Sequence, residues 1–235
     1  MPEKETLPSV FVNGVRLHYA VAGEGRPVLL CHGNGEDHHL FDPLSARLTA
    51  AGFRVYAPDS RGHGANEPLA EYHYADMAED MYGFIRALGL HQPVFYGHSD
   101  GGIVGLLLET AHPGTLSLLA ASGVNLSPEG LDPAFLAECE EMNRSKPDPL
   151  ITLMLTEPHI SPESLRQIAC PVLITAGEKD LVLPGETRRI ASALPRCRLV
   201  IVEGADHGSY IRDGGIMGDL LLRFLEQPPE GPSLS

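Results

Sequence analysis

A single serine stands between two glycines in the stretch Gly97-His98-Ser99-Asp100-Gly101, with apolar residues on both sides. The run PVFY before it predicts a strand and GGIVGLLLET after it predicts a helix, so Ser99 is expected on the turn between them. So sharp a turn brings backbone segments close together, and Gly97 and Gly101 lack the Cβ atoms that would collide. The serine hydroxyl is pushed clear of the sheet, and the backbone N–H of Asp100 points into the same space. The stretch therefore predicts a nucleophilic serine.

A serine hydroxyl is a poor nucleophile near pH 7 unless a base lies within hydrogen-bond reach. His207 follows the last apolar run, RLVIVEG, in a glycine-flanked loop and is the predicted base. The predicted acid is Asp180, just beyond the preceding run, PVLITAG. Glu178 lies closer to the strand end, as is typical of a loop or capping residue. Asp206 is adjacent to His207, so its carboxylate is badly placed to reach the ring.

Short apolar runs alternate with helix-length amphipathic stretches along the chain, which predicts strands buried between two layers of helices. The stretch VFVNGVRLHYAVAG contains Asn13-Gly14, a pair that favours a tight hairpin turn. The expected strands after this hairpin are PVLLC, FRVYAP, PVFYG, LSLLAASG, PVLITAG and RLVIVEG. The expected helices cover 40–51, 74–88, 100–111, 185–194 and 213–226. The pattern predicts an α/β fold with a doubly wound, mostly parallel sheet, as a single domain over residues 1–235.

The alternation is interrupted between residues 126 and 168, which contain six prolines and no strand signal. Helices are expected there at 132–144 and 149–156. An insertion at the carboxyl edge of an open α/β sheet lies over the usual ligand site, and loops this long are commonly functional. The segment predicts a small helical lid, with a long irregular connection as the alternative. The Pro- and Ser-rich tail at 227–235 is expected to be frayed.

Composition excludes several classes of partner. The formal net charge of −14 disfavours nucleic acid and anionic membrane surfaces, which repel an acidic protein. The first ten residues carry charges and no apolar run, unlike a secretory signal, and no segment approaches the ~20 apolar residues of a membrane span. The four cysteines form no CxxC pair, and Cys31 and Cys170 are expected in the core. These features predict a cytoplasmic protein with reduced thiols.

With Ser99, Asp180 and His207 in this order, the sequence resembles the α/β-hydrolase superfamily over nearly its whole length. CHGNG, after the PVLLC run, resembles the HG-x loop of the family. The resemblance implies that the backbone N–H groups of Asn34 and Asp100 form an oxyanion hole.

Two further stretches bear on this resemblance. DSRGHG at 59–64 resembles a loop that is usually structural in the family, which implies a scaffold role for Arg61 and His63. The family more often has glycine before the catalytic histidine, where this chain has Asp206. The serine at 99 sets the chain apart from relatives with an aspartate nucleophile, the haloalkane dehalogenases and epoxide hydrolases.

The resemblance implies a carboxylesterase-like serine hydrolase that cleaves a small-molecule ester through an acyl-enzyme, with no metal or organic cofactor. Two alternatives remain open: cleavage of a thioester, lactone, amide or carbon–carbon bond beside a ketone, and a non-catalytic ligand-binding protein on the same fold. A metallohydrolase based on His32, His38 and His39 is disfavoured, because an H-x-H-x-D-H motif would need histidines at 33 and 35, which are glycines. The Asp100 side chain either caps its helix or projects toward the pocket.

Overall fold

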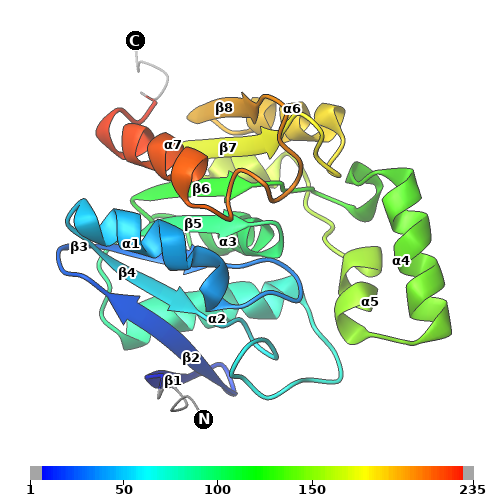
Figure 1. Cartoon of the computed structure of the whole chain (residues 1–235), viewed down its shortest axis with the longest axis horizontal. Coiled ribbons are helices and arrows are strands. Elements are labelled where there is room, and N and C mark those ends of the chain that lie inside the picture. The colour runs from blue at the N-terminus through cyan, green and yellow to red at the C-terminus, as the bar shows by residue number, and fades with distance from the viewer. Residues whose placement is uncertain (1–6, 230–235) are drawn as a thin grey trace.

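The expected strands form one eight-stranded sheet in the computed structural model, which describes residues 7–229. Figure 1 shows the sheet, whose strand order is β1-β2-β4-β3-β5-β6-β7-β8. The strands from β3 to β8 are parallel, whereas β1 pairs antiparallel with β2 and β2 with β4. Their bounds are β1 Ser9–Val12, β2 Val15–Ala22, β3 Arg26–Cys31, β4 Phe53–Pro58, β5 Val94–His98, β6 Leu118–Ser122, β7 Val172–Gly177 and β8 Cys197–Val202. This confirms the mostly parallel sheet with an N-terminal hairpin.

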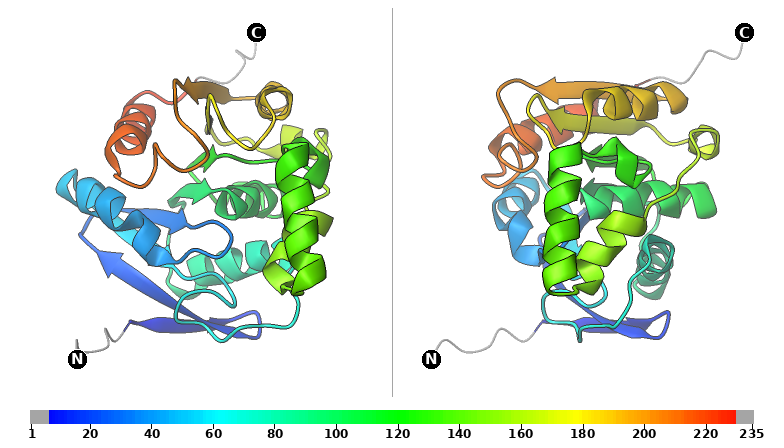
Figure 2. Two further views of the ribbon diagram at one scale, coloured as in Figure 1. Left: turned by 45° about the vertical axis from the view of Figure 1, so that its right-hand side comes forward. Right: turned by 90° about the vertical axis from the view of Figure 1, so that its right-hand side faces the viewer.

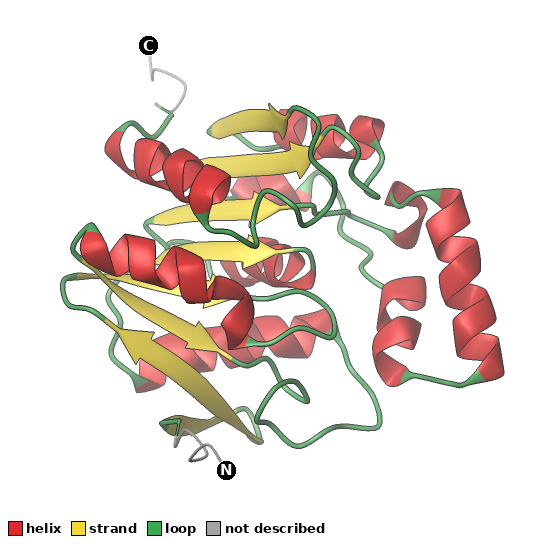
Figure 3. Ribbon diagram, viewed as in Figure 1, coloured by secondary structure: helices red, strands yellow, loops and turns green. Residues whose placement is uncertain are grey.

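Helices cover both faces of the sheet (Figure 3), with α1 and α7 on one face and α2, α3 and α6 on the other. Two separate clusters of buried apolar side chains fill the two interfaces, and both Cys31 and Cys170 lie in one of them. The bounds are α1 Asp42–Ala50, α2 Tyr74–Ala87, α3 Asp100–Ala111, α6 Pro184–Ala193 and α7 Gly215–Glu226. No helix within residues 7–229 combines the length and apolarity needed to cross a membrane.

Each predicted helix begins and ends within two residues of an observed helix, and the first differs most. The helix expected at 40–51 is divided into a 3₁₀ helix, His38–Phe41, and α1. Pro43 lies in the first turn of α1, where its missing N–H leaves no hydrogen bond unmade, so the α-helix begins there. Of the predicted frayed tail, residues 230–235 lie outside the described part of the chain.

The segment from 126 to 168 contains two helices, α4 Pro133–Ser145 and α5 Pro149–Thr156, and two short 3₁₀ turns. Figure 2 shows α4 and α5 side by side beyond the carboxyl ends of the strands. Each helix begins with an aspartate followed by proline: the Asp132 and Asp148 side chains accept backbone N–H groups of the first turn. Pro133 and Pro149 therefore begin helices and do not prevent them.

The loop after β4 holds the hairpin and α2 against the sheet. Arg61 forms hydrogen bonds with both oxygens of Asp80, at 2.6 and 2.7 Å, and a third with Asp76. The buried carboxylate of Asp59 accepts the backbone N–H of His38, its Nδ1–H at 2.7 Å, and the backbone N–H of Ala65. These contacts are the scaffold role expected of this loop.

We predict that Asp59→Asn lowers the free energy of unfolding by about 1–3 kcal/mol at pH 7, because an amide NH₂ would then face a buried donor. Burial would raise the pKa of Asp59, but the hydrogen bonds from Ala65 and His38 outweigh it and hold the pKa below its usual value of 3.8. The carboxylate therefore stabilises the fold above the unfolded pKa, and this contribution is lost as the pH falls through the folded pKa.

Urea unfolding of the wild-type protein and of Asp59→Asn between pH 7 and about pH 3 measures the difference in their free energies of unfolding. The stability difference should narrow below about pH 4. A difference that stays constant over this range would contradict the assignment.

Candidate active site

The parallel register of neighbouring strands brings the predicted site residues to one edge of the sheet. His98, the last residue of β5, pairs with Ser122 at the end of β6, and β7 ends beside β8 in the same direction. Ser99 directly follows β5, while Asp180 and His207 lie in the loops after β7 and β8. Residues far apart in the sequence therefore meet at the carboxyl edge.

Ser99 occupies a strained turn between β5 and α3. Its backbone has φ +51° and ψ −118°, and a positive φ is unusual for a residue with a side chain. A Cβ atom at Gly97 would overlap the carbonyl of Gly101, and one at Gly101 would overlap the carbonyl of Cys31. The Ser99 N–H donates to the carbonyl of Ser122 at 2.8 Å, which anchors the turn to β6.

His207 and Asp180 are joined by a hydrogen bond of 2.7 Å between Nδ1 and Oδ1. The Asp180 side chain is 2% exposed, and its oxygens also accept the N–H groups of Val182 and Gly177. Burial would raise the pKa of Asp180, but the hydrogen bond and charge of His207 and the two backbone donors outweigh it and lower the pKa. The carboxylate is therefore fixed and ionised beside the imidazole, which orients the ring with Nδ1 as the donor.

The two competing acids have other partners. Glu178 accepts the backbone N–H of Gly204 at 2.8 Å, which ties together the loops after β7 and β8. Asp206 accepts the N–H groups of Gly208 and Ser209 within its own turn. Both carboxylates close loops, and Asp180 is the one that contacts His207.

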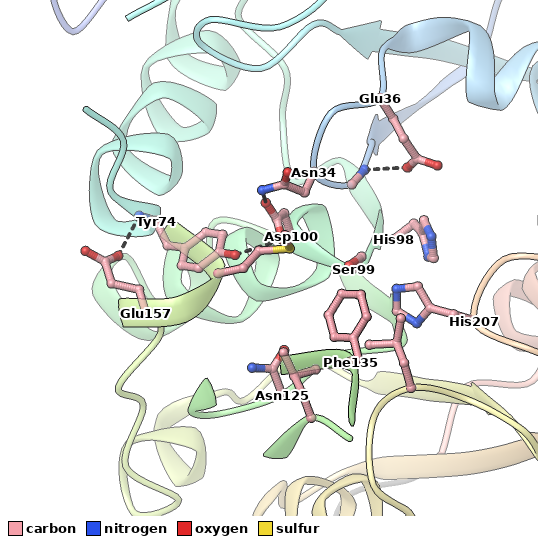
Figure 4. A pocket seen from close by; sticks show the side chains of 14 residues that line it. Asn34, Glu36, Tyr74, His98, Ser99, Asp100, Asn125, Phe135, Glu157 and His207 are labelled. Atoms are coloured by element: carbon pink, nitrogen blue, oxygen red, sulfur yellow. Dashed lines mark hydrogen bonds between the residues drawn. The ribbon is translucent and has the colours of Figure 1, made fainter. Parts of the chain in front are cut away.

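Ser99 and His207 line a cavity of about 220 Å³, and Figure 4 shows them together with His98 at one side of it. The opposite side includes Tyr74 and Glu157. The 126–168 segment contributes four lining residues, Leu131, Phe135, Met154 and Glu157. The sequence did not reveal this lining, because helical periodicity in a short segment does not say which face meets the cavity.

Two residues that sequence reasoning missed shape the surroundings of His207. Gly123, directly after β6, has φ +61°, and a Cβ there would lie 2.6 Å from Cε1 and 2.7 Å from Nδ1 of the ring. The only signal was a glycine at a strand end. His98 lies with its ring centre 4.8 Å from that of His207, and burial lowers its pKa to about 3. His98 therefore remains neutral and adds no positive charge beside His207.

The two residues predicted for the oxyanion hole lie next to Ser99. Asp100 is the first residue of α3, a position whose backbone N–H has no acceptor within the helix. The loop that holds Asn34 is closed by Glu36: Gly33 N–H donates to the Glu36 carboxylate at 2.9 Å, and Glu36 N–H donates to the Gly33 carbonyl. The Gly33–Glu36 contacts thus hold the loop that carries Asn34.

The fold agrees with a comparison of the sequence with known families. The sequence model of the family described as "Alpha/beta hydrolase family" matches residues 28–215 of this chain. The chain belongs to the alpha/beta hydrolase family.

Curated relatives and solved structures of the family differ in their described activities. The human serine hydrolase BPHL is 29% identical over 252 residues, covering 94% of this chain and 87% of that protein. Bifunctional epoxide hydrolase 2 of Sus scrofa is 42% identical over 94 residues, which are 39% of this chain and only 17% of that relative. An esterase from Exiguobacterium antarcticum superposes with a TM-score of 0.83 at 19% identity, covering 94% of this chain and all of that one. The last likeness concerns the fold alone.

In this alpha/beta hydrolase, His32, His38 and His39 each form local hydrogen bonds. His32 donates from Nδ1 to the Gly33 carbonyl and accepts the Ser60 N–H at Nε2, and burial lowers its pKa to about 4. His38 and His39 each form a hydrogen bond with a different aspartate. Within residues 7–229, no group of three or more potential ligands is arranged to hold a metal ion.

We predict that Asp180→Asn reduces turnover of an activated ester by up to about 10⁴-fold in this alpha/beta hydrolase, because the amide favours the wrong tautomer of His207. Glu178→Gln is the matched control, since it changes an exposed acid two residues away and should stay within about tenfold. Steady-state kinetics measure the kcat of both variants against that of the wild type. Exchanged phenotypes would move the acid to Glu178.

Proposed function

We propose that this chain is a serine hydrolase that cleaves a small-molecule carboxylic ester, with Ser99 as nucleophile, His207 as general base and Asp180 as the acid that orients it. One observation carries the proposal: a strained serine and a histidine hydrogen-bonded to a buried carboxylate line the same cavity. These are the parts that activate a hydroxyl near neutral pH.

The proposed reaction follows from these positions. His207 takes the proton of Ser99 as the hydroxyl attacks the acyl carbonyl, and the backbone N–H groups of Asn34 and Asp100 stabilise the oxyanion. His207 then returns the proton to the leaving alcohol. Water repeats the sequence on the acyl-enzyme, so the reaction uses no cofactor.

The relatives narrow the choice of bond. The similarity to a serine hydrolase supports acyl transfer. An ester is favoured over a thioester, lactone, amide or carbon–carbon bond, because its alkoxide leaves easily and demands least of the site. Epoxide opening, the activity named for one relative, fits less well: the sequence resemblance associates it with an aspartate nucleophile, and this chain has Ser99.

The charge of the cavity favours an uncharged acyl substrate. Three carboxyl groups line it, those of Glu36, Asp100 and Glu157, and none of its described lining residues is lysine or arginine. A substrate carboxylate would be buried there without a partner, which is unfavourable. The overall charge of −14 likewise favours a small molecule over nucleic acid or a membrane. The four free cysteines are in keeping with a cytoplasmic setting.

We predict that Ser99→Ala leaves a folded protein whose kcat for p-nitrophenyl acetate falls by about 10⁴-fold or more. Alanine keeps the Cβ atom, so the turn loses only the hydroxyl. Circular dichroism checks the fold and steady-state kinetics check turnover. Near wild-type turnover in this variant would refute the proposed nucleophile, and absence of multiple turnover in the wild type would favour the ligand-binding alternative.

We also propose that the 126–168 segment acts as a lid that selects the acyl chain. Phe135 of α4 lines the cavity, whereas Met142 of the same helix is 57% exposed. We predict that Phe135→Ala lowers kcat/KM for hexanoate and longer p-nitrophenyl esters by about tenfold, through loss of apolar contact, and changes acetate hydrolysis little. Met142→Ala is the matched control. A chain-length profile shared by wild type and both variants would show that Phe135 does not contact the acyl group.

A further inference from the structure

One side-chain amide connects three separate segments at the cavity. The Nδ2 group of Asn34 donates to Oδ2 of Asp100 at 3.0 Å and to the backbone carbonyl of Leu150 at 3.1 Å. Asn34 belongs to the loop after β3, Asp100 begins α3, and Leu150 lies in the first turn of α5. The residue whose N–H is proposed to meet the oxyanion therefore also touches the 126–168 segment.

The Asp100 carboxylate is fixed by a second donor. Its Oδ1 accepts the hydroxyl of Tyr74 at 2.7 Å, and the residue is only 2% exposed, so it projects toward the cavity side and does not cap its helix. Burial raises the pKa of Asp100, although the hydrogen bonds from Tyr74 and Asn34 act to lower it. If the Asn34 side chain turned away, a buried carboxylate oxygen would lose its partner, which is costly.

The other end of α5 is held by His73 and by Tyr74, which also contacts Asp100. Glu157, directly after α5, accepts Nδ1–H of His73 at 2.6 Å and the backbone N–H of Tyr74 at 3.0 Å. Tyr74 thus contacts the end of α5 through its backbone and Asp100 through its hydroxyl. Figure 4 shows Glu157, Tyr74, Asp100 and Asn34 as neighbours along one side of the cavity. Helix α5 is anchored at both ends to residues that converge on the carboxylate beside Ser99.

We propose that Asn34, Asp100 and Tyr74 are positioning residues that couple the seating of helix α5 to the geometry of the oxyanion hole. This inference rests on the proposed function. With α5 in place, the Leu150 carbonyl and the Asp100 carboxylate together hold the Asn34 amide. They thereby fix the backbone on which the Asn34 N–H is carried. When α5 moves away, one of these two contacts is lost and the N–H is less well aimed.

The test is Asn34→Ala, which removes the bridging amide and keeps the backbone N–H. With p-nitrophenyl acetate we expect kcat to fall about tenfold, less than the 10²–10³-fold typical of losing an oxyanion donor outright, with KM within about threefold. Inhibition by phenylboronic acid, whose serine adduct is a tetrahedral anion, should weaken by a similar factor. Hydrogen exchange of the α5 amides should become faster, because one anchor is gone.

Two further variants complete the experiment. Arg144→Ala is the control: its side chain is exposed and forms an ion pair with Glu141 of the same helix, α4. Its kcat should stay within about twofold. Tyr74→Phe removes the hydroxyl and keeps the backbone contact to Glu157, so kcat should fall severalfold while α5 exchange stays unchanged. Tyr74→Phe also carries the test if Asn34→Ala does not fold.

The outcomes separate the two proposals. Faster exchange of α5 in Asn34→Ala with an unchanged kcat would show that the amide holds only the helix, and would overturn the coupling. An unchanged kcat in Asn34→Ala and Tyr74→Phe beside an inactive Ser99→Ala would also overturn the coupling and leave the proposed function intact. Equal rates in wild type and Ser99→Ala would overturn the proposed function, and the coupling with it.

Discussion

The first turn of α3 lies against the carboxyl ends of β3 and β5 so closely that no side chain fits between the backbones. Cβ atoms at Gly97 and Gly101 would each overlap a backbone carbonyl, and the strained φ of Ser99 is the geometric consequence of this approach. Strain of this kind persists where surrounding contacts over-determine it, here the hydrogen bond from Ser99 N–H to the carbonyl of Ser122. The hydroxyl and the free N–H groups of a helix start are thereby presented to one cavity.

The rest of the site depends on the parallel sheet around that turn. Because β5 to β8 run in the same direction, the loops that follow them share one edge, and Asp180 and His207 reach the position of Ser99 from separate loops. Backbone donors at Gly177 and Val182 hold the acid, and the missing side chain at Gly123 leaves room for the imidazole. The hydrogen bonds of the Asp180 carboxylate thus come from residues outside the 126–168 segment.

That segment adds polar as well as apolar walls. Phe135 and Met154 contribute apolar surface to the cavity. Glu157 and the Asn34–Leu150 hydrogen bond connect α5 to Tyr74 and Asn34, which both contact the buried Asp100. Burial raises the pKa of both Asp100 and Glu36, while hydrogen bonds from Tyr74 and Asn34 to Asp100 and from Gly33 to Glu36 act to lower it. The polar contacts that anchor the segment and those that surround the serine therefore belong to one network.

The sequence by itself determined the local features: the hairpin, the order of strands and helices, the serine turn, and helices α3 and α5 at their observed bounds. These follow from apolar periodicity, glycine and proline, which act within a few residues. The sequence favoured Asp180 over Glu178 by position, and the tertiary structure shows that Asp180 contacts His207. Only the tertiary structure decided that the Asp100 side chain turns to Tyr74 and does not cap its helix. Each of these choices depends on strand register and on burial against segments distant in the chain, and such contacts leave no periodic signal in the sequence.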